Sequence, residues 1–214
     1  MDHLGELSDA TPELVPQLPG PGRPPSTTRR ELQQVAIEMF SAQGYDQVTI
    51  EALAAAAGIS RRTFFRYFPA KADTLMADFD QDVERLRLAL RYSDPRLGIM
   101  AAIRRAVVAV NSYQVDDLAH LRQRLQLQSD HPALLANAIM HYERWQDVVA
   151  QFAADRLGQP AEALVPQVIA RAAFGAAYAG FMSWLCEDAG ALGPKLDAAL
   201  AALAEGLGDR AGTA

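Results

Sequence analysis

The sequence predicts an all-α protein, for three reasons. Half of the 214 residues are hydrophobic, with many Ala, Leu and Arg residues and few β-branched runs, a composition that favours helices over strands. Apolar residues recur at the three- and four-residue spacing of a helix face. Residues that commonly cap the start of a helix, such as serine and threonine, alternate along the sequence with glycine or proline residues that commonly end one. No segment repeats with a period of 20 to 50 residues, so a helical solenoid is not expected.

The N-terminal segment, residues 1–26, contains six of the twelve prolines and shows no helical pattern. Because proline lacks an amide donor and breaks helices, this segment is predicted to be a disordered tail. A short flexible tail is also predicted at 209–214.

The first helix is predicted from a capping box, in which Thr28 and Glu31 cap each other's backbone amides. Gly44 is expected to end this helix, since glycine readily adopts the backbone conformation that follows a helix. Its apolar face consists of Leu32, Val35, Ala36, Met39 and Phe40.

Two short helices follow, each with its own N-cap residue. Thr49 caps the second helix and Gly58 closes it. Ser60 caps the third helix and Pro69 ends it. So tight a turn between two helices predicts a helix-turn-helix, whose second helix enters the major groove of DNA. The apolar residues expected to complete a three-helix core are Ile50, Leu53, Ala54, Ala57, Ile59, Phe64 and Phe68.

The rest of the chain is predicted to form six longer helices. The first opens at Lys71 and runs to about Tyr92. We therefore expect two parts, a head at 27–71 and a body at 72–208. The first long helix has one apolar stripe of Leu75, Phe79, Val83, Leu86 and Leu90. The other five helices are expected at about 96–113, 116–129, 132–157, 161–188 and 194–208.

Charge is distributed unevenly between these parts. The formal net charge of the chain is −6, but residues 23–71 contain seven basic and four acidic residues, a net of +3. Residues 72–214 contain 13 basic and 18 acidic residues, a net of −5. A basic block beside an acidic one is typical of a nucleic-acid-binding head, although ordinary domains also reach such a charge.

The third helix has the residue types that read DNA. Arg61 and Arg62 lie on its first turn, where either guanidinium could form two hydrogen bonds to guanine. Thr63 suits a thymine methyl or a phosphate, and Arg66 and Tyr67 suit backbone phosphates. The alternative for each is a solvated surface position. The expected DNA-contacting set, with the two caps whose hydroxyls and neighbouring amides can face phosphate, is Thr49, Ser60, Arg61, Arg62, Thr63, Arg66 and Tyr67.

Residues 27–75 resemble the DNA-binding domain of TetR/AcrR-type transcriptional regulators. The matching features are F-S-A-Q-G-Y at 40–45, T-I at 49–50, A-A-G-I-S at 56–60, T-F-F at 63–65, Y-F at 67–68, and Lys71. The resemblance implies a regulator whose head binds an operator and whose body responds to a ligand.

The resemblance also assigns Lys71 and Phe65 to the DNA-binding set. Similar regulators hold phosphate with the lysine at the position of Lys71. They often have tyrosine at the position of Phe65, where its hydroxyl reaches a phosphate. Phe65 cannot form that bond and could instead press on the sugar-phosphate edge or pack against the first helix. Arg29 and Arg30 could add further phosphate contacts.

The last two helices are predicted to form a dimer interface. On a continuous helix from 168 to 186, large residues share one face and small residues the other, and small residues let a second helix approach closely. Four leucines of the last helix repeat at 4-3-4 spacing, which suits a partner helix. The alternative is packing within one chain. The large residues are Phe174, Tyr178, Phe181 and Leu185; the expected interface is Ala172, Ala176, Ala179, Ser183, Leu196, Leu200, Leu203 and Leu207.

The body is predicted to enclose a hydrophobic ligand, with a filled core as the alternative. The expected lining is Phe79, Leu86, Met100, Ile103, Val107, Met140, Trp145, Phe174, Tyr178 and Phe181. The R-W at 144–145, F-A-A-D-R-L-G at 152–158 and W-L at 184–185 are similar to regulators of the mycofactocin type. That resemblance implies an acyl-CoA-like ligand, whose phosphates Arg104, Arg105 or Arg144 could meet.

No enzyme, metal or cofactor is expected. The sequence lacks nucleophile-elbow, P-loop and dinucleotide-binding motifs, and its histidines lack metal-ligand spacing. One cysteine, no signal pattern and an apolar run limited to 172–186 predict a cytoplasmic protein without a membrane segment.

The predicted function is therefore a repressor that binds a palindromic operator as a homodimer and is released by a small hydrophobic or acyl-CoA-like effector. An activator, a helical enzyme, or an interaction protein with a vestigial helix-turn-helix are the alternatives.

Overall fold

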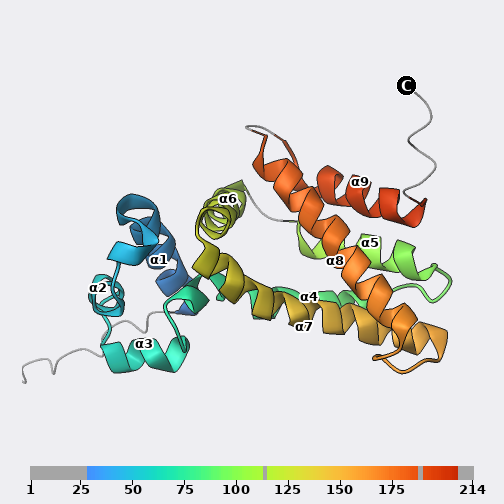
Figure 1. Cartoon of the computed structure of the whole chain (residues 1–214), viewed down its shortest axis with the longest axis horizontal. Coiled ribbons are helices and arrows are strands. Elements are labelled where there is room, and N and C mark those ends of the chain that lie inside the picture. The colour runs from blue at the N-terminus through green and yellow to red at the C-terminus, as the bar shows by residue number, and fades with distance from the viewer. Residues whose placement is uncertain (1–27, 113–114, 188–189, 207–214) are drawn as a thin grey trace, which may run out of the picture.

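The computed structural model describes residues 28–112, 115–187 and 190–206, and within these ranges the chain forms only helices, as predicted (Figure 1). The predicted tails at 1–26 and 209–214 lie outside the described residues. In chain order the helices are α1 (Arg29–Gln43), the 3₁₀ helix η1 (Tyr45–Gln47), α2 (Ile50–Ala56), α3 (Arg61–Tyr67), the 3₁₀ helix η2 (Ala72–Met76), α4 (Phe79–Arg91), α5 (Ile99–Val110), α6 (Val115–Asp130), α7 (Pro132–Leu157), α8 (Leu164–Leu185) and α9 (Leu192–Ala204).

The caps predicted for the head are confirmed. The Thr28 Oγ1 accepts a hydrogen bond from the Glu31 amide at 3.1 Å, and the Glu31 carboxylate accepts one from the Thr28 amide at 2.7 Å. Thr49 caps α2 through the Ala52 amide, also at 3.1 Å. Gly44 ends α1 at a φ of +85°, in the region that favours glycine.

The core of the head joins all three helices and reaches into the body. Phe64 of α3 and Phe68, which caps the end of α3, are fully buried, as expected, and pack with Phe40 of α1. Leu127 of α6 and Leu134 of α7 belong to the same cluster. The head is therefore packed directly against the body as well as joined to it through the chain.

The fourth helix begins later than the sequence predicts. Residues 72–76 form the 3₁₀ helix η2, and α4 starts only at Phe79. Side chains hold the backbone of η2 in this shape, because Asp73 accepts a hydrogen bond from the Ala70 amide and Thr74 donates one to the Lys71 carbonyl. Asp73 also accepts a hydrogen bond from the Asn137 amide of α7, at 2.8 Å. The prediction of one helix from 71 to 92 was therefore wrong at its start.

The body is a bundle in which α4 and α7 run side by side away from the head, α8 crosses α7, and α9 packs against α8 and α5 (Figure 1). Helices α8 and α9 approach each other closely at Gly180, where an added Cβ would lie 3.2 Å from the Leu196 Cα. Among the described helices, α8 alone has the length and apolar composition of a membrane span. Its inner face packs against α7 and α9, and 28% of the apolar window is buried within the protomer.

Two leucines assigned to the dimer interface lie elsewhere. Leu196 and Leu200 are fully buried within the protomer and pack in the body core with α8 residues such as Trp184. A side chain without exposed surface cannot contact a partner, so this part of the prediction was wrong. Leu203 is half-buried, and Leu207 lies outside the described residues.

Candidate nucleic-acid interface and ligand cavity

The outer surface of α3 presents a group of cationic side chains. Arg61, Arg62 and Arg66 are exposed, while Phe64 on the opposite side of the helix is fully buried. Ser60 caps the helix by accepting the Thr63 amide at 3.1 Å, and its hydroxyl lies 2.9 Å from the Thr63 hydroxyl. The buried aromatic anchor and the N-cap fix the orientation of the helix, so its arginines project together from one surface.

Arg61 has two partners within the head. Its Nε lies 3.0 Å from a Glu51 carboxylate oxygen, and its guanidinium stands 5.4 Å from the ring centre of Phe65. Phe65 is 43% exposed and packs edge-on against Phe64. Both ends of the Arg61–Glu51 ion pair are exposed, so exchanging Glu51 for a DNA partner costs little.

The Lys71 side chain is hydrogen-bonded to backbone carbonyls within the head. Its Nζ donates to the Tyr45 carbonyl at 2.7 Å and the Val48 carbonyl at 2.8 Å, and lies 3.9 Å from the Tyr45 ring centre. Burial lowers the pKa of the Lys71 ammonium, while the charge of Asp46 acts in the opposite direction. Lys71 therefore holds the connection between α1 and α2. One of its three N–H groups remains for the predicted phosphate contact.

A cavity with about 60 Å³ of free volume lies in the body. Four predicted lining residues lie outside it. Leu86 and Ile103 are fully buried in the core, Met100 packs against that core, and Met140 is 66% exposed. Sequence periodicity identified their apolar faces but could not distinguish the cavity from the core or from solvent. Six predicted residues do line the cavity: Phe79, Val107, Trp145, Phe174, Tyr178 and Phe181.

The cavity wall is largely aromatic. The rings of Phe174 and Tyr178 stack with centres 6.1 Å apart, and Tyr142 lies 5.0 Å from Phe174. Tyr142 was missed in the sequence, although it lies one helical turn before Trp145 on α7. Burial raises the pKa of the Tyr142 phenol, and the nearby positive charge of Arg124 offsets part of that rise.

The cavity also has a polar part, which the sequence did not reveal. Asp82 of α4, Asn111 at the end of α5, and Arg124 and Gln128 of α6 all line it. The Arg124 Nε is buried and has no hydrogen-bond partner among the described residues. Leaving such a donor without a partner costs about 1–3 kcal/mol.

The arginines predicted to bind the phosphates of the ligand do not line the cavity; two of them form ion pairs with aspartates and the third is exposed. Arg104 forms two hydrogen bonds of 2.6 Å to Asp197 of α9, and Arg144 pairs with Asp80. Arg105 is exposed. None of the three lines the cavity, whereas Arg124 does.

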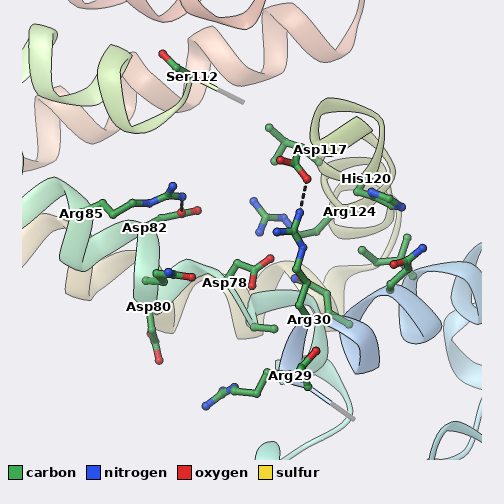
Figure 2. A pocket seen from close by; sticks show the side chains of 17 residues that line it. Arg29, Arg30, Asp78, Asp80, Asp82, Arg85, Ser112, Asp117, His120 and Arg124 are labelled. Carbon is green, nitrogen blue, oxygen red and sulfur yellow. Dashed lines mark hydrogen bonds and ion pairs between the residues drawn. The ribbon is translucent and has the colours of Figure 1, made fainter. Parts of the chain in front are cut away.

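A polar groove of about 890 Å³ lies at the boundary of head and body, between α1, α4 and α6. Arg30 extends from α1 toward Asp117 of α6 and forms an ion pair with it across the groove (Figure 2). Arg124 and Asp82 line this groove as well as the cavity. The two spaces therefore adjoin at these side chains.

Comparisons with known proteins agree with this arrangement. The model of bacterial regulatory proteins of the tetR family matches residues 32–77, and the MftR C-terminal domain matches residues 97–208. MftR of Mycobacterium tuberculosis (strain ATCC 25618 / H37Rv), named for regulation of mycofactocin biosynthesis, is 33% identical over 186 residues, covering 87% of this chain and 94% of MftR. The HTH-type transcriptional regulator TcmR of Streptomyces glaucescens is 30% identical over 149 residues, covering 65% of this chain and 66% of TcmR.

Solved structures share the fold at lower identity. FadR of Bacillus halodurans superposes with a TM-score of 0.60 at 17% identity, covering 82% of this chain and 97% of its own. FadR of Thermus thermophilus, a TetR-family repressor in complex with lauroyl-CoA, gives a TM-score of 0.54 at 21% identity. The match covers 87% of this chain and 98% of that FadR chain. The match to MftR extends over most of both chains. The chain therefore belongs to the TetR family of bacterial regulatory proteins, as a transcriptional regulator with a helix-turn-helix DNA-binding domain and a C-terminal domain of the MftR type.

Proposed function

We propose that this regulator is a repressor that binds a palindromic operator as a homodimer and leaves it when a small hydrophobic or acyl-CoA-like effector enters the body. The observation that carries the proposal is the exposed arginine surface of α3, held in place by Ser60 and by the buried Phe64. Arg61 and Arg62 are assigned to base edges, and Thr49, Ser60, Thr63, Arg66 and Tyr67 to phosphate or nearby groups.

The dimer is assigned to the outer face of α8. Val168, Gly175, Ala179 and Ser183 are exposed in the protomer and follow one another at helical spacing. The predicted residues Ala172 and Ala176 are half-buried beside them. A two-fold pair fits this protein's role, because helix-turn-helix dimers read two half-sites about one helical turn apart.

The effector is assigned to the aromatic cavity. FadR of Thermus thermophilus, which shares the fold, binds lauroyl-CoA. The free volume here accommodates only a few water molecules, so an acyl chain has to displace side chains. Phe79 at the start of α4 lines the cavity, and Leu75 just before it packs in the head core. Displacing Phe79 therefore moves the segment that joins body to head. The coupling free energy required is about 1–3 kcal/mol.

The regulator is proposed over an enzyme because the relatives of this chain are transcriptional regulators. Among the described residues, no set of three His, Cys, Asp or Glu side chains could hold a metal ion. We place the protein in the cytoplasm, where its operator lies.

Selection from random duplex DNA tests this function. The enriched sequences should form an inverted repeat whose half-sites are about 10 base pairs apart, centre to centre. Affinity should fall steeply with salt, since phosphate contacts release counterions. Adding lauroyl-CoA should release the DNA. No enrichment of any duplex at low ionic strength would contradict the proposal.

A further inference from the structure

Two side chains of α6 that line the effector cavity contain buried hydrogen-bond donors without a strong acceptor. The Arg124 Nε has no partner among the described residues. The Gln128 amide, on a side chain only 4% exposed, donates to the Met76 sulfur at 3.1 Å, and a thioether is a weak acceptor. Because residues four apart share a helix face, both donors are presented to the same side.

The carboxylates nearest these donors have other cationic partners. Asp82, the carboxylate that also lines the cavity, pairs with Arg85. Asp117 on the groove side pairs with Arg30. The groove as a whole is balanced in charge, since four arginines and four aspartates line it. Buried polar groups in native proteins are generally satisfied, so a ligand with an acceptor group completes this site.

We propose that Arg124, with Gln128, is the anion-binding end of the effector site, so that the effector is an amphipathic anion. Its apolar body lies among Phe174, Tyr178 and the other aromatic rings, and its carboxylate or phosphate binds the Arg124 guanidinium. This inference depends on the proposed function, since it concerns the ligand of the same cavity. It also predicts which hydrophobic molecules bind more weakly, namely those without an anionic group.

The position of Arg124 links the ligand to the head. Arg124 lines both the cavity and the groove that contains the Arg30–Asp117 ion pair (Figure 2). An anionic group bound at Arg124 and extending into the groove competes with Asp117 for Arg30. Effector binding would then weaken a contact between α1 and α6, in addition to displacing Phe79 at the start of α4.

The test compares three twelve-carbon probes, dodecanoate, lauroyl-CoA and dodecanol, by calorimetric titration of the full-length protein. The variants are Arg124→Met, Arg124→Lys and the matched control Arg105→Gln, which alters an exposed arginine away from the cavity. The wild type should bind the anions at least about tenfold more tightly than dodecanol, the size of a charge-assisted hydrogen bond. Arg124→Met should remove that preference and leave dodecanol affinity unchanged. Arg124→Lys should retain most of it, and Arg105→Gln should match the wild type.

The two anionic probes identify the group that Arg124 holds. Loss of affinity confined to dodecanoate indicates a carboxylate, and loss confined to lauroyl-CoA indicates a phosphate; either supports the inference. Equal binding of the anions to wild type and Arg124→Met, with dodecanol still bound, overturns the inference and leaves the proposed ligand-responsive function standing. Failure of all three probes to bind the wild type overturns both. DNA binding without ligand is independent of these outcomes.

Discussion

The guanidinium of Arg30 on α1 forms an ion pair with the carboxylate of Asp117 on α6, across the groove between head and body. The two residues are 87 positions apart in the sequence. The connecting segment η2 is held from both sides: the Gln33 amide of α1 donates to the Leu75 carbonyl, and the Asn137 amide of α7 donates to Asp73. Any rotation of the head relative to the body must stretch these contacts.

Replacing Asp117 with Asn should weaken the communication between ligand and operator. Without the carboxylate, Arg30 no longer holds α1 to α6, so the head is less sensitive to changes in the body. We expect the ratio of operator dissociation constants with and without lauroyl-CoA to fall several-fold from a wild-type value of about 5–150. The unfolding free energy should change by less than about 1 kcal/mol, because the Arg30 side chain is exposed. Glu143→Gln, at an exposed site on α7, is the control. An unchanged ratio would exclude a coupling role for the pair.

Gly180→Ala should destabilise the body. The new Cβ would lie 3.2 Å from both the Leu196 Cα and the Lys195 carbonyl oxygen, and these backbone atoms can yield only if α9 shifts. We expect a loss of about 1–3 kcal/mol in thermal or denaturant unfolding. Gly193→Ala is the matched control, because its Cβ would meet no atom within 4 Å and alanine favours the helix by up to about 1 kcal/mol. Equal stability of the two variants would contradict the close approach of α8 and α9.

Ala179→Arg should produce monomers. Ala179 is exposed on the α8 face assigned to the dimer, and a charged guanidinium there would have to be buried without a partner. Light scattering after gel filtration should give the mass of two chains for the wild type and of one for the variant. Ala101→Arg, at an exposed site on α5, should remain a dimer. A dimeric Ala179→Arg variant would place the interface on another surface.

The α5–α9 contact should be acid-sensitive through Asp197. Its hydrogen bonds from Arg104 hold the pKa of the Asp197 carboxyl below its usual value. A carboxyl whose pKa is lowered by folding stabilises the protein above its unfolded pKa, and this contribution is lost as pH falls through the folded pKa. The melting temperature of Asp197→Asn should therefore be lower than that of the wild type at pH 7, and the difference should shrink below about pH 4. The effect should be small, since both side chains are partly exposed. A difference that is constant with pH would assign the loss to another cause.

The features predicted well from the sequence are those set by nearby residues. The caps at Thr28, Thr49 and Ser60 bond amides only three positions away, so a sequence window contains all the atoms involved. The predicted start of α4 was wrong. Asp73 shapes the segment before this helix through a bond to the nearby Ala70 amide, and it is also held by Asn137, 64 positions distant, which a short stretch of sequence does not reveal.

Periodicity identified apolar faces but not what covers them. The 4-3-4 spacing of leucines predicted a partner for α9, and the partner at Leu196 and Leu200 proved to be the same chain. Arg124 and Gln128 resembled ordinary surface positions in the sequence. Only the packing of α6 against the body places their side chains at the cavity.

The most direct measurement of the central claim is the affinity of the Arg61→Ala and Arg62→Ala variants for the selected operator. Fluorescence anisotropy should show each variant losing about 1–3 kcal/mol, because an arginine that reads guanine loses both of its hydrogen bonds. Arg87→Ala, at an exposed arginine on α4, should bind like the wild type. If both head variants remain folded and bind the operator as tightly as the wild type, α3 does not read DNA and the account is wrong.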